Sequence, residues 1–165
     1  MRRRGCVDLM AIKLNTGSNQ YRGENKNLFE INVVIEWAKP VYSVVAFLSI
    51  FEDFVRSEES KKITIMMDAF RLWQLIEGLG LLLEGGEEFT LQSGSNKKIN
   101  MALLKKEDAQ TFFLNFSQES KKISVPYNKV QAIALRSSLI QMLRDAETQT
   151  RQMQIEYSKK LIKGG

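Results

Sequence analysis

The chain has 165 residues, of which 44% are hydrophobic, and this size and composition suit one compact domain with a real core. Lysine and arginine number 24 against 19 acidic residues, and the resulting formal charge of +5 modestly favours a polyanionic partner. Histidine is absent and Cys6 is the single cysteine, which excludes histidine-based catalysis, an internal disulfide and a cysteine-ligated zinc. We therefore expect no metal, no cofactor and no enzymatic activity.

Residues 1–10 form a basic leader that lacks the apolar segment of a secretory signal, and we expect it to be flexible. No window approaches the roughly 18 consecutive apolar residues of a membrane helix. A lone cysteine is typical of a reducing compartment. These features predict a cytoplasmic or nucleoid-associated protein, or an organellar one in a eukaryote, without a membrane partner.

The first half of the chain predicts four strands, over residues 11–16, 28–37, 41–51 and 61–66. The second of these alternates apolar and polar residues, which is typical of an antiparallel sheet with one buried face. The third is apolar on both faces, so we expect a partner subunit or the other half of the chain to cover its second face. Residues 17–19, Gly-Ser-Asn, have the chemistry of a turn, and residues 22–27 form a polar loop.

A helix is predicted after the fourth strand, with Asp68 as its N-cap and the pair Gly85-Gly86 at or just beyond its end. Its apolar residues recur at helical spacing, which predicts a buried face. That face carries Phe70, Trp73, Leu75 or Ile76, and Leu79.

The second half of the chain predicts four shorter strands, over residues 89–92, 98–105, 111–116 and 121–125. Asn128 is then predicted to cap a last helix. Its apolar stripe is expected to comprise Val130, Ile133, Ala134, Leu139, Ile140 and Leu143. Residues 145–152 are polar all round, whereas Met153, Tyr157 and Leu161 recur at a spacing of four, so this end of the helix is either frayed or docked on another subunit.

The two halves repeat one another. The segment Ser60-Lys61-Lys62-Ile63-Thr64-Ile65 recurs as Ser120-Lys121-Lys122-Ile123-Ser124-Val125, at an offset of 60 residues (60 to 120). A second match places residues 14–19 over residues 91–96, at an offset of 77 (14 to 91). We predict an α+β fold made of a duplicated ββββα unit, with antiparallel sheets and one helix per repeat on one face. The predicted domain spans residues 11–143, with repeats at 11–86 and 87–143 and a helical extension at 144–165.

This order of elements resembles the Whirly fold and its relatives, which include the kinetoplastid guide-RNA-binding proteins and the transcriptional positive-cofactor-four family. The segment Ile123-Ser124-Val125-Pro126-Tyr127-Asn128 resembles the strand-to-helix junction of the positive-cofactor-four group. The Lys-Gly-Lys-Ala-Ala-Leu signature of the plant Whirly proteins is absent. Pur-type repeats share the element order and stay open as an alternative. The resemblance implies a protein that binds single-stranded nucleic acid.

Lysines at strand ends can contact phosphates, and aromatic side chains between them can stack on bases. We expect the Lys61-Lys62 and Lys121-Lys122 pairs to occupy equivalent points of one groove, because the duplication relates them. A lysine pair before a strand is, taken alone, more often a solvated edge that discourages association. The candidate nucleic-acid-binding residues are Lys13, Lys61, Lys62, Lys97, Lys98, Lys105, Lys106, Phe113, Lys121, Lys122 and Tyr127.

The predicted function is binding of single-stranded DNA with little sequence preference, in replication, recombination or transcription. An RNA-binding protein of the same fold is an alternative. Another is an oligomerisation or interaction module, because the strand over residues 41–51 and the last helix both suggest assembly into a homo-oligomer. A carboxylate-dependent nuclease is a weaker alternative, because Glu52, Asp53, Asp68 and Asp108 lack paired-ligand spacing.

Overall fold

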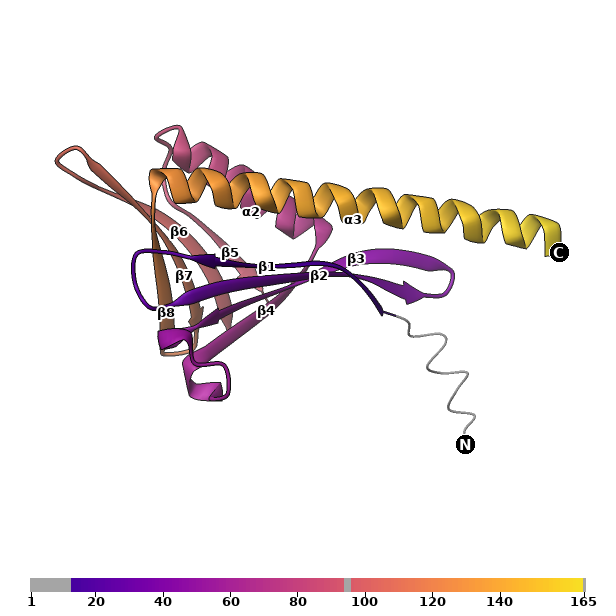
Figure 1. The fold of residues 1–165 in the computed structure, drawn as a ribbon, viewed down its shortest axis with the longest axis horizontal. Helices are drawn as coiled ribbons and strands as arrows, with labels where there is room; N and C mark the ends of the chain where they lie inside the picture. Colours follow the sequence, from indigo (N-terminus) through magenta and orange to yellow (C-terminus); the bar gives the residue numbers. More distant parts are fainter. Residues whose placement is uncertain (1–12, 94–95, 165) are drawn as a thin grey trace.

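The computed structural model describes residues 13–93 and 96–164. Two four-stranded antiparallel sheets form, and a helix follows each (Figure 1). This arrangement confirms the predicted duplicated ββββα unit. The predicted flexible leader at residues 1–10 lies outside the described residues, and the predicted domain boundaries stay predictions.

The first sheet has the order β1-β2-β3-β4, and a charged connection with two short 3-10 turns separates its last two strands. The elements of this repeat are β1 (Lys13–Arg22), β2 (Leu28–Ala38), β3 (Val41–Phe51), η1 (Glu52–Phe54), η2 (Glu59–Lys61), β4 (Lys62–Asp68) and α2 (Ala69–Leu83).

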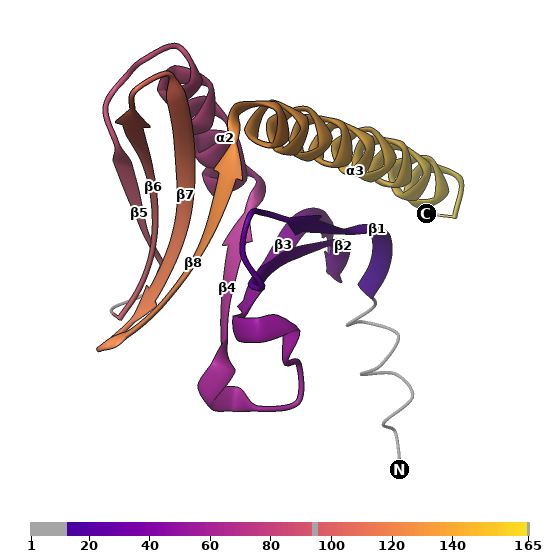
Figure 2. The same ribbon diagram turned by 60° about the vertical axis from the view of Figure 1, so that its left-hand side comes forward.

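The second sheet has the order β5-β6-β7-β8, with short hairpins throughout. Its elements are β5 (Phe89–Ser93), β6 (Lys97–Lys106), β7 (Ala109–Gln118), β8 (Lys121–Asn128) and α3 (Lys129–Gly164). The sheets form two layers that diverge from one another, and α3 runs along the first sheet (Figure 2).

Strand alternation sorts the side chains of each sheet onto two faces. The inner faces of both sheets share one core with α2 and α3, and residues such as Phe29, Leu48, Phe116 and Leu139 are at most 1% exposed there. The opposite face of each sheet carries the polar residues. Each sheet therefore has one face covered by helices and one face turned outward.

The equivalence of the two repeats follows from strand pairing. Thr64 is paired with Ser49, and Ser124 is paired in the same way with Asn115. Continuing across each sheet, Gln20 takes the same place as Thr90. The offset is thus 60 for the last strands (64 to 124) but 70 for the first strands (20 to 90), so the predicted offset of 77 is wrong.

The predicted turn at residues 17–19 is also wrong, because β1 continues through it. The register of β1 shifts between Asn15 and Gly17, which marks a bulge rather than a turn. Ser18 then donates from its hydroxyl to the Asn32 side chain at 2.9 Å. The short polar side chains therefore serve cross-strand hydrogen bonding, and the hairpin falls in the predicted polar loop after Arg22.

Both helix caps are confirmed. The Asp68 carboxylate accepts from the Arg71 amide at 2.9 Å, and α2 ends before the Gly85-Gly86 pair. Asn128 and Gln131 cap α3 reciprocally: the Asn128 side chain accepts from the Gln131 amide at 2.8 Å, and the Gln131 side chain accepts from the Asn128 amide at 2.9 Å.

The predicted buried faces of the helices are only partly correct. Phe70 is 69% exposed, and Val130 is 76% exposed. The residues of α3 that enter the core are Ala132, Leu135, Leu139, Leu143 and Ala146. Each helix lies against two sheets at once, so the buried stripe follows the line of contact rather than the most apolar helical arc.

The far half of α3 does not need another subunit for docking, because it packs on the chain's own β2–β3 hairpin. The Gln154 side chain accepts from the Tyr42 amide at 2.9 Å and donates to the Pro40 carbonyl at 3.0 Å. The Tyr157 ring contacts Trp37 edge-on, with centroids 4.7 Å apart. Leu161, the third residue of the predicted contact set, is 55% exposed.

The free edge of β4 is covered by side chains of the second sheet. Every other carbonyl oxygen on this edge accepts a hydrogen bond: that of Lys62 from Lys121 Nζ at 2.9 Å, that of Thr64 from Lys97 Nζ at 2.7 Å, and that of Met66 from Ser93 Oγ at 3.2 Å. An unpaired strand edge invites association with another chain. Here the chain satisfies its own edge.

The free edge of β8 is covered by the turn between β1 and β2. The Glu24 amide donates to the Pro126 carbonyl at 2.7 Å, and the Asn27 side chain donates to the Ser124 carbonyl at 2.7 Å. A Cβ at Gly23 would lie 2.2 Å from the Pro126 oxygen, so only glycine allows this approach. Each repeat therefore caps the last strand of the other with its first hairpin.

Candidate nucleic-acid interface

We name the outward faces of the two sheets the first outer face and the second outer face. The first comprises Lys13, Asn15, Ser18, Gln20, Arg22, Leu28, Glu30, Asn32, Val34, Glu36, Ala38, Val41, Ser43, Val45, Phe47, Ser49, Phe51, Lys62, Thr64, Met66 and Asp68. The second comprises Thr90, Gln92, Lys98, Asn100, Ala102, Leu104, Lys106, Ala109, Thr111, Phe113, Asn115, Ser117, Lys122, Ser124, Pro126 and Asn128.

The two outer faces repeat one lysine and one phenylalanine. Lys62 and Lys122 open equivalent edge strands at the offset of 60 (62 to 122). Lys62 is paired with Phe51 on β3, and Lys122 is paired with Ser117 on β7. Phe47 and Phe113 each lie four residues before that paired residue, so they are equivalent at an offset of 66 (47 to 113). Both rings are half-buried. Proteins that bind single-stranded nucleic acid combine positive charge with aromatic side chains on which bases stack.

The second outer face grades from basic to apolar along its strands. At one end, Lys98 and Lys122 flank Ser117 in a single row across β6, β7 and β8. Four residues further along, Phe113 lies between Ala102 and Pro126.

An amide row separates these two ends. Asn115 is 7% exposed, its Nδ2 donates to Asn100 Oδ1 at 2.9 Å, and its Oδ1 accepts from the Ser124 hydroxyl. Asn115 is satisfied within the row, whereas Asn100 Nδ2 donates to Thr90 Oγ1 at 3.0 Å and, outside the row, to the Glu88 carboxylate at 3.2 Å.

The first outer face carries acidic residues that the second lacks. Glu36 pairs with Lys13 at 3.2 Å, and Glu30 pairs with Arg56 at 2.7 Å. Lys62 pairs with Glu59, on the connection before β4, at 3.3 Å. The lysines and acids of this face therefore largely compensate one another.

Three predicted lysines occupy other places. Lys97 and Lys121 extend from the inner side of the second sheet to the β4 edge, where their ammonium groups bind backbone carbonyls. Lys61, which is equivalent to Lys121, is half-buried in η2. Among the hydrogen bonds of the described residues, its ammonium group does not bind a backbone carbonyl as that of Lys121 does. The predicted groove of two complete lysine pairs is thus reduced to one outward lysine per pair.

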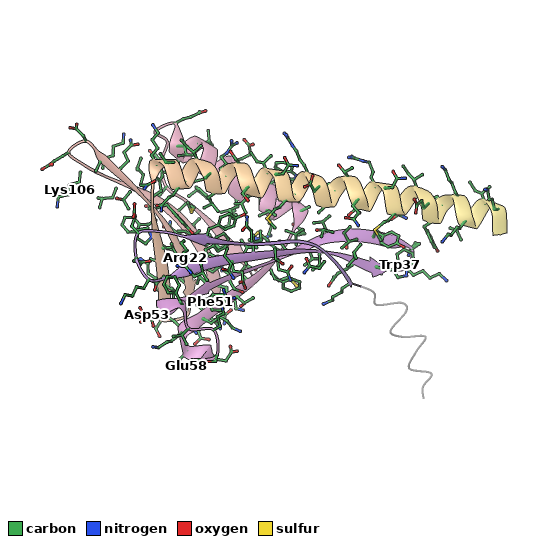
Figure 3. All side chains as sticks on the ribbon, in the orientation of Figure 1. Arg22, Trp37, Phe51, Asp53, Glu58 and Lys106 are labelled. Atoms are coloured by element: carbon green, nitrogen blue, oxygen red, sulfur yellow. The ribbon has the colours of Figure 1, made fainter. Side chains whose placement is uncertain are left out.

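Lys105 and Lys106 are exposed at the end of β6 opposite Lys98. Figure 3 shows Lys106 at the tip of the β6–β7 hairpin. Lys106 shares the outward parity of Lys98, but both lysines of the tip lie at the far end of the sheet from the row of Lys98 and Lys122.

Tyr127 is a core residue. Its side chain is 1% exposed, and its hydroxyl donates to the Tyr21 carbonyl at 3.0 Å. Burial, with a smaller effect of the nearby Tyr21 phenol, raises the pKa of Tyr127 far above its usual value. The pKa of Tyr21 is also raised by burial, against the opposing hydrogen bonds of Ser138 and Asn19. The Tyr127 ring therefore faces the core rather than a ligand.

Sequence reasoning missed Phe47. The predicted offset of 60 places Phe47 over Glu107, and the strand around it reads as apolar on both faces. Pairing the third strands at 66 would have placed it over Phe113. The difference arises because the connection between β3 and β4, with η1 and η2, is longer than the turn between β7 and β8.

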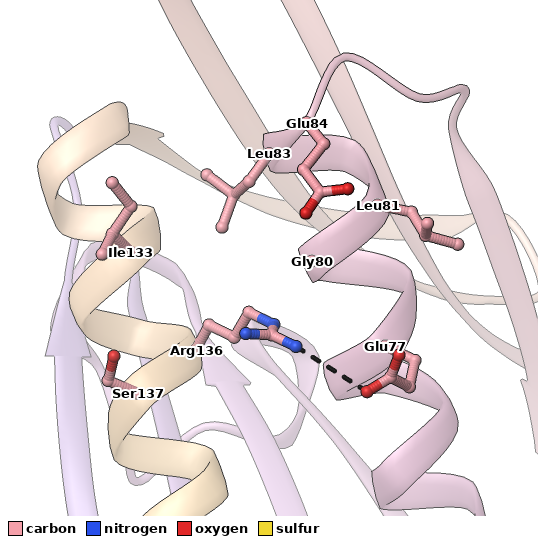
Figure 4. A pocket seen from close by; sticks show the side chains of 8 residues that line it. All are labelled: Glu77, Gly80, Leu81, Leu83, Glu84, Ile133, Arg136 and Ser137. Atoms are coloured by element: carbon pink, nitrogen blue, oxygen red, sulfur yellow. Dashed lines mark ion pairs between the residues drawn. The ribbon is translucent and has the colours of Figure 1, made fainter.

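Some cavities border the outer faces: one of about 670 Å³ is lined by Ala102 of the second outer face together with Glu88 and Lys105. One of about 340 Å³ separates α2 from α3, where Arg136 pairs with Glu77 at 3.7 Å and its Nε donates to the Ile76 carbonyl at 3.0 Å (Figure 4). Another, of about 300 Å³, lies beside Met66 and Arg71 at the end of β4. Within residues 13–93 and 96–164, no group of three or more acidic or cysteine side chains is placed to hold a metal.

No protein-family model matches this sequence, and no curated protein matches it significantly. Two solved structures align with most of the chain. WHY1 from Arabidopsis thaliana is 12% identical over 91% of this chain and 94% of its own, with a TM-score of 0.48. The plant transcriptional regulator PBF-2 is 11% identical over 83% of this chain and 84% of its own, with a TM-score of 0.43.

The architecture is Whirly-like. The strand order and register given above show this: two four-stranded antiparallel sheets form, and a helix follows each. The sequence resemblance led us to expect this arrangement. In the described part of the chain, no helix is long and apolar enough to cross a membrane.

Proposed function

We propose that this protein binds single-stranded nucleic acid on its outer sheet surface, with DNA as the principal ligand and little sequence preference. The observation that carries this proposal is the repetition of a lysine and a phenylalanine at equivalent register positions of two uncovered faces. Lysines contact phosphates, and aromatic rings stack on any base, contributing roughly 1–3 kcal/mol per base. Replication, recombination and transcription expose unpaired strands, and we place the protein's role among them.

Fluorescence anisotropy with a labelled oligo-dT strand tests this proposal. We expect binding that weakens as salt rises, with a slope of about −0.7 per contacted phosphate in a plot of log K against log salt. A duplex of the same length should compete poorly, because its bases are not free to stack. Equal competition by duplex, or the absence of binding at low salt, would contradict the proposal. An oligo-rU strand in the same assay compares RNA with DNA.

We also propose that the chain self-associates through α3 and the outer end of β3. Val41 is 54% exposed, and the far half of α3 leaves Ile155, Leu161 and Ile162 between 47% and 82% exposed. Exposed apolar surface of this kind marks interaction sites. Light scattering on the eluted protein should give a mass above the 19.0 kDa of one chain. A monomer at every concentration would contradict self-association without affecting the nucleic-acid proposal.

A further inference from the structure

The aromatic rings of the two outer faces have different surroundings. In the first outer face, Lys13 Nζ lies 5.6 Å from the centroid of the Phe47 ring, and the Arg56 guanidinium lies 5.3 Å from that of Phe51. A cation within about 6 Å of an aromatic face interacts favourably with it. For Phe113 there is no such cation among the described residues.

The lysines of the two outer faces differ in whether they form ion pairs within the chain. Lys13 and Lys62, on the first outer face, both take part in ion pairs within the chain. Lys98 and Lys122, on the second, have no acidic partner within 4.0 Å in the described part of the chain, and no position of the second outer face is acidic. Two lysines and two rings of the first face thus have partners within the chain, and its Arg22 lies 4.8 Å from the Phe54 ring centroid, whereas Lys98, Lys122 and Phe113 of the second face have no such partners among the described residues.

We propose that the second outer face is the one that holds the unpaired strand, and that the chain's own side chains occupy the equivalent positions of the first. This inference rests on the proposed function and assigns it to one of two related surfaces. Phosphates lie along the row formed by Lys98 and Lys122, and a base stacks on Phe113.

The dimensions of the second outer face allow this arrangement. Phe113 is four residues from Ser117, the strand position between the two lysines, which is about 14 Å along an extended strand. The long lysine side chains and the reach of a nucleotide from phosphate to base bridge this distance. The amide groups of Asn100 and Asn115 lie between, bonded to one another, so they are poorly placed to read base edges. Binding should therefore tolerate any base.

The duplication supplies a matched pair of variants, Phe113→Ala and Phe47→Ala. We expect Phe113→Ala to weaken oligo-dT binding on the order of tenfold, from the loss of one stacked base. Phe47→Ala should change the affinity less than twofold. Equal losses from both variants, or a larger loss from Phe47→Ala, would overturn the assignment while leaving single-strand binding intact. No binding by the unmodified protein would instead overturn the proposed function itself.

An abasic strand separates stacking from a general loss of structure. Phe113→Ala and the unmodified protein should bind an abasic oligonucleotide equally, because a strand without bases cannot stack on either. A variant that binds the abasic strand more weakly would show that Phe113 supports the fold rather than the base, and this would overturn its role. Phe113→Tyr should retain the affinity for oligo-dT, whereas Phe113→Leu should lose it.

Two double variants that remove the same number of positive charges test the phosphate row. Lys98→Gln with Lys122→Gln should reduce the salt slope by about 1.4, that is, two contacts on single strands. Lys105→Gln with Lys106→Gln removes the same charge at the hairpin tip and should change the slope by less than half as much. The reverse order would place the phosphates at the tip and overturn the assignment.

Discussion

The edges of β4 and β8 are equivalent in the fold but are covered by different chemistry. The β4 edge accepts from flexible side chains, those of Ser93, Lys97 and Lys121. The carbonyl oxygens of the β8 edge accept hydrogen bonds from the β1–β2 turn, whose backbone lies close to Pro126 at Gly23. Lys97 and Asn27 are equivalent residues at an offset of 70 (27 to 97), and both donate to equivalent carbonyls, those of Thr64 and Ser124.

In these two repeats, equivalent carbonyls receive a hydrogen bond, but the residue that donates it differs. One copy meets the need with a long side chain across a gap, and the other with a closely packed turn. The first solution tolerates sequence change near the gap, whereas the second requires a glycine. The two edges should therefore respond differently to equivalent substitutions.

The largest effect is expected from Gly23→Ala. The added Cβ would meet the Pro126 oxygen at 2.2 Å and Val125 Cγ1 at 2.6 Å, so the turn must move and lose the Glu24 hydrogen bond. Overpacking and the lost bond should lower the free energy of unfolding by about 2–4 kcal/mol. Urea denaturation followed by circular dichroism measures the change. Gly17→Ala is the control, since its Cβ would lie 3.4 Å from Met142 Cε, and a similar loss there would contradict the explanation.

Lys121→Met compared with Lys61→Met should give a smaller effect. Lys121 Nζ binds the Glu59 carbonyl at 3.0 Å and the Lys62 carbonyl at 2.9 Å, and methionine keeps the apolar stem without the donor. Because hydrogen bonds to charged groups contribute about 1.5–3 kcal/mol and this site is half-exposed, we expect a loss of about 1–2 kcal/mol in the same urea assay. Lys61→Met should lose less than about 0.5 kcal/mol. Equal losses would show that the β4 edge does not depend on Lys121.

Tyr127→Phe should have the smallest effect near neutral pH, a loss of about 1 kcal/mol from the missing hydrogen bond to Tyr21. Met67, the equivalent residue of β4, has no hydroxyl. Because burial raises the Tyr127 pKa above its usual 10.0, the unfolded chain ionises first, and stability should fall as the pH rises above about 10. The variant should show a shallower fall in urea denaturation between pH 9 and pH 11. An unchanged slope would indicate that Tyr127 is not the group responsible.

The element order, both helix caps and the outward parity of Lys62, Lys98, Lys122 and Phe113 were all predictable from the amino-acid sequence. These features depend on local chemistry and on the two-residue period of a strand, both of which are visible in the amino-acid sequence. It did not determine the offset between the first strands, because a polar Gly-Ser-Asn segment suits a bulge as well as a turn.

Only the tertiary structure decided how the surfaces of the sheets are used. The ammonium groups of Lys97 and Lys121 bind an edge of the other sheet, and Lys13 on β1 reaches across β2 to the Phe47 ring on β3. Periodicity assigns a side chain to a face, but contacts between sheets depend on how two layers pack, and that is set by the whole core. The contacts that occupy the first outer face join strands that are distant in sequence and the β3–β4 connection, all within the first repeat, so they depend on the tertiary fold of that repeat.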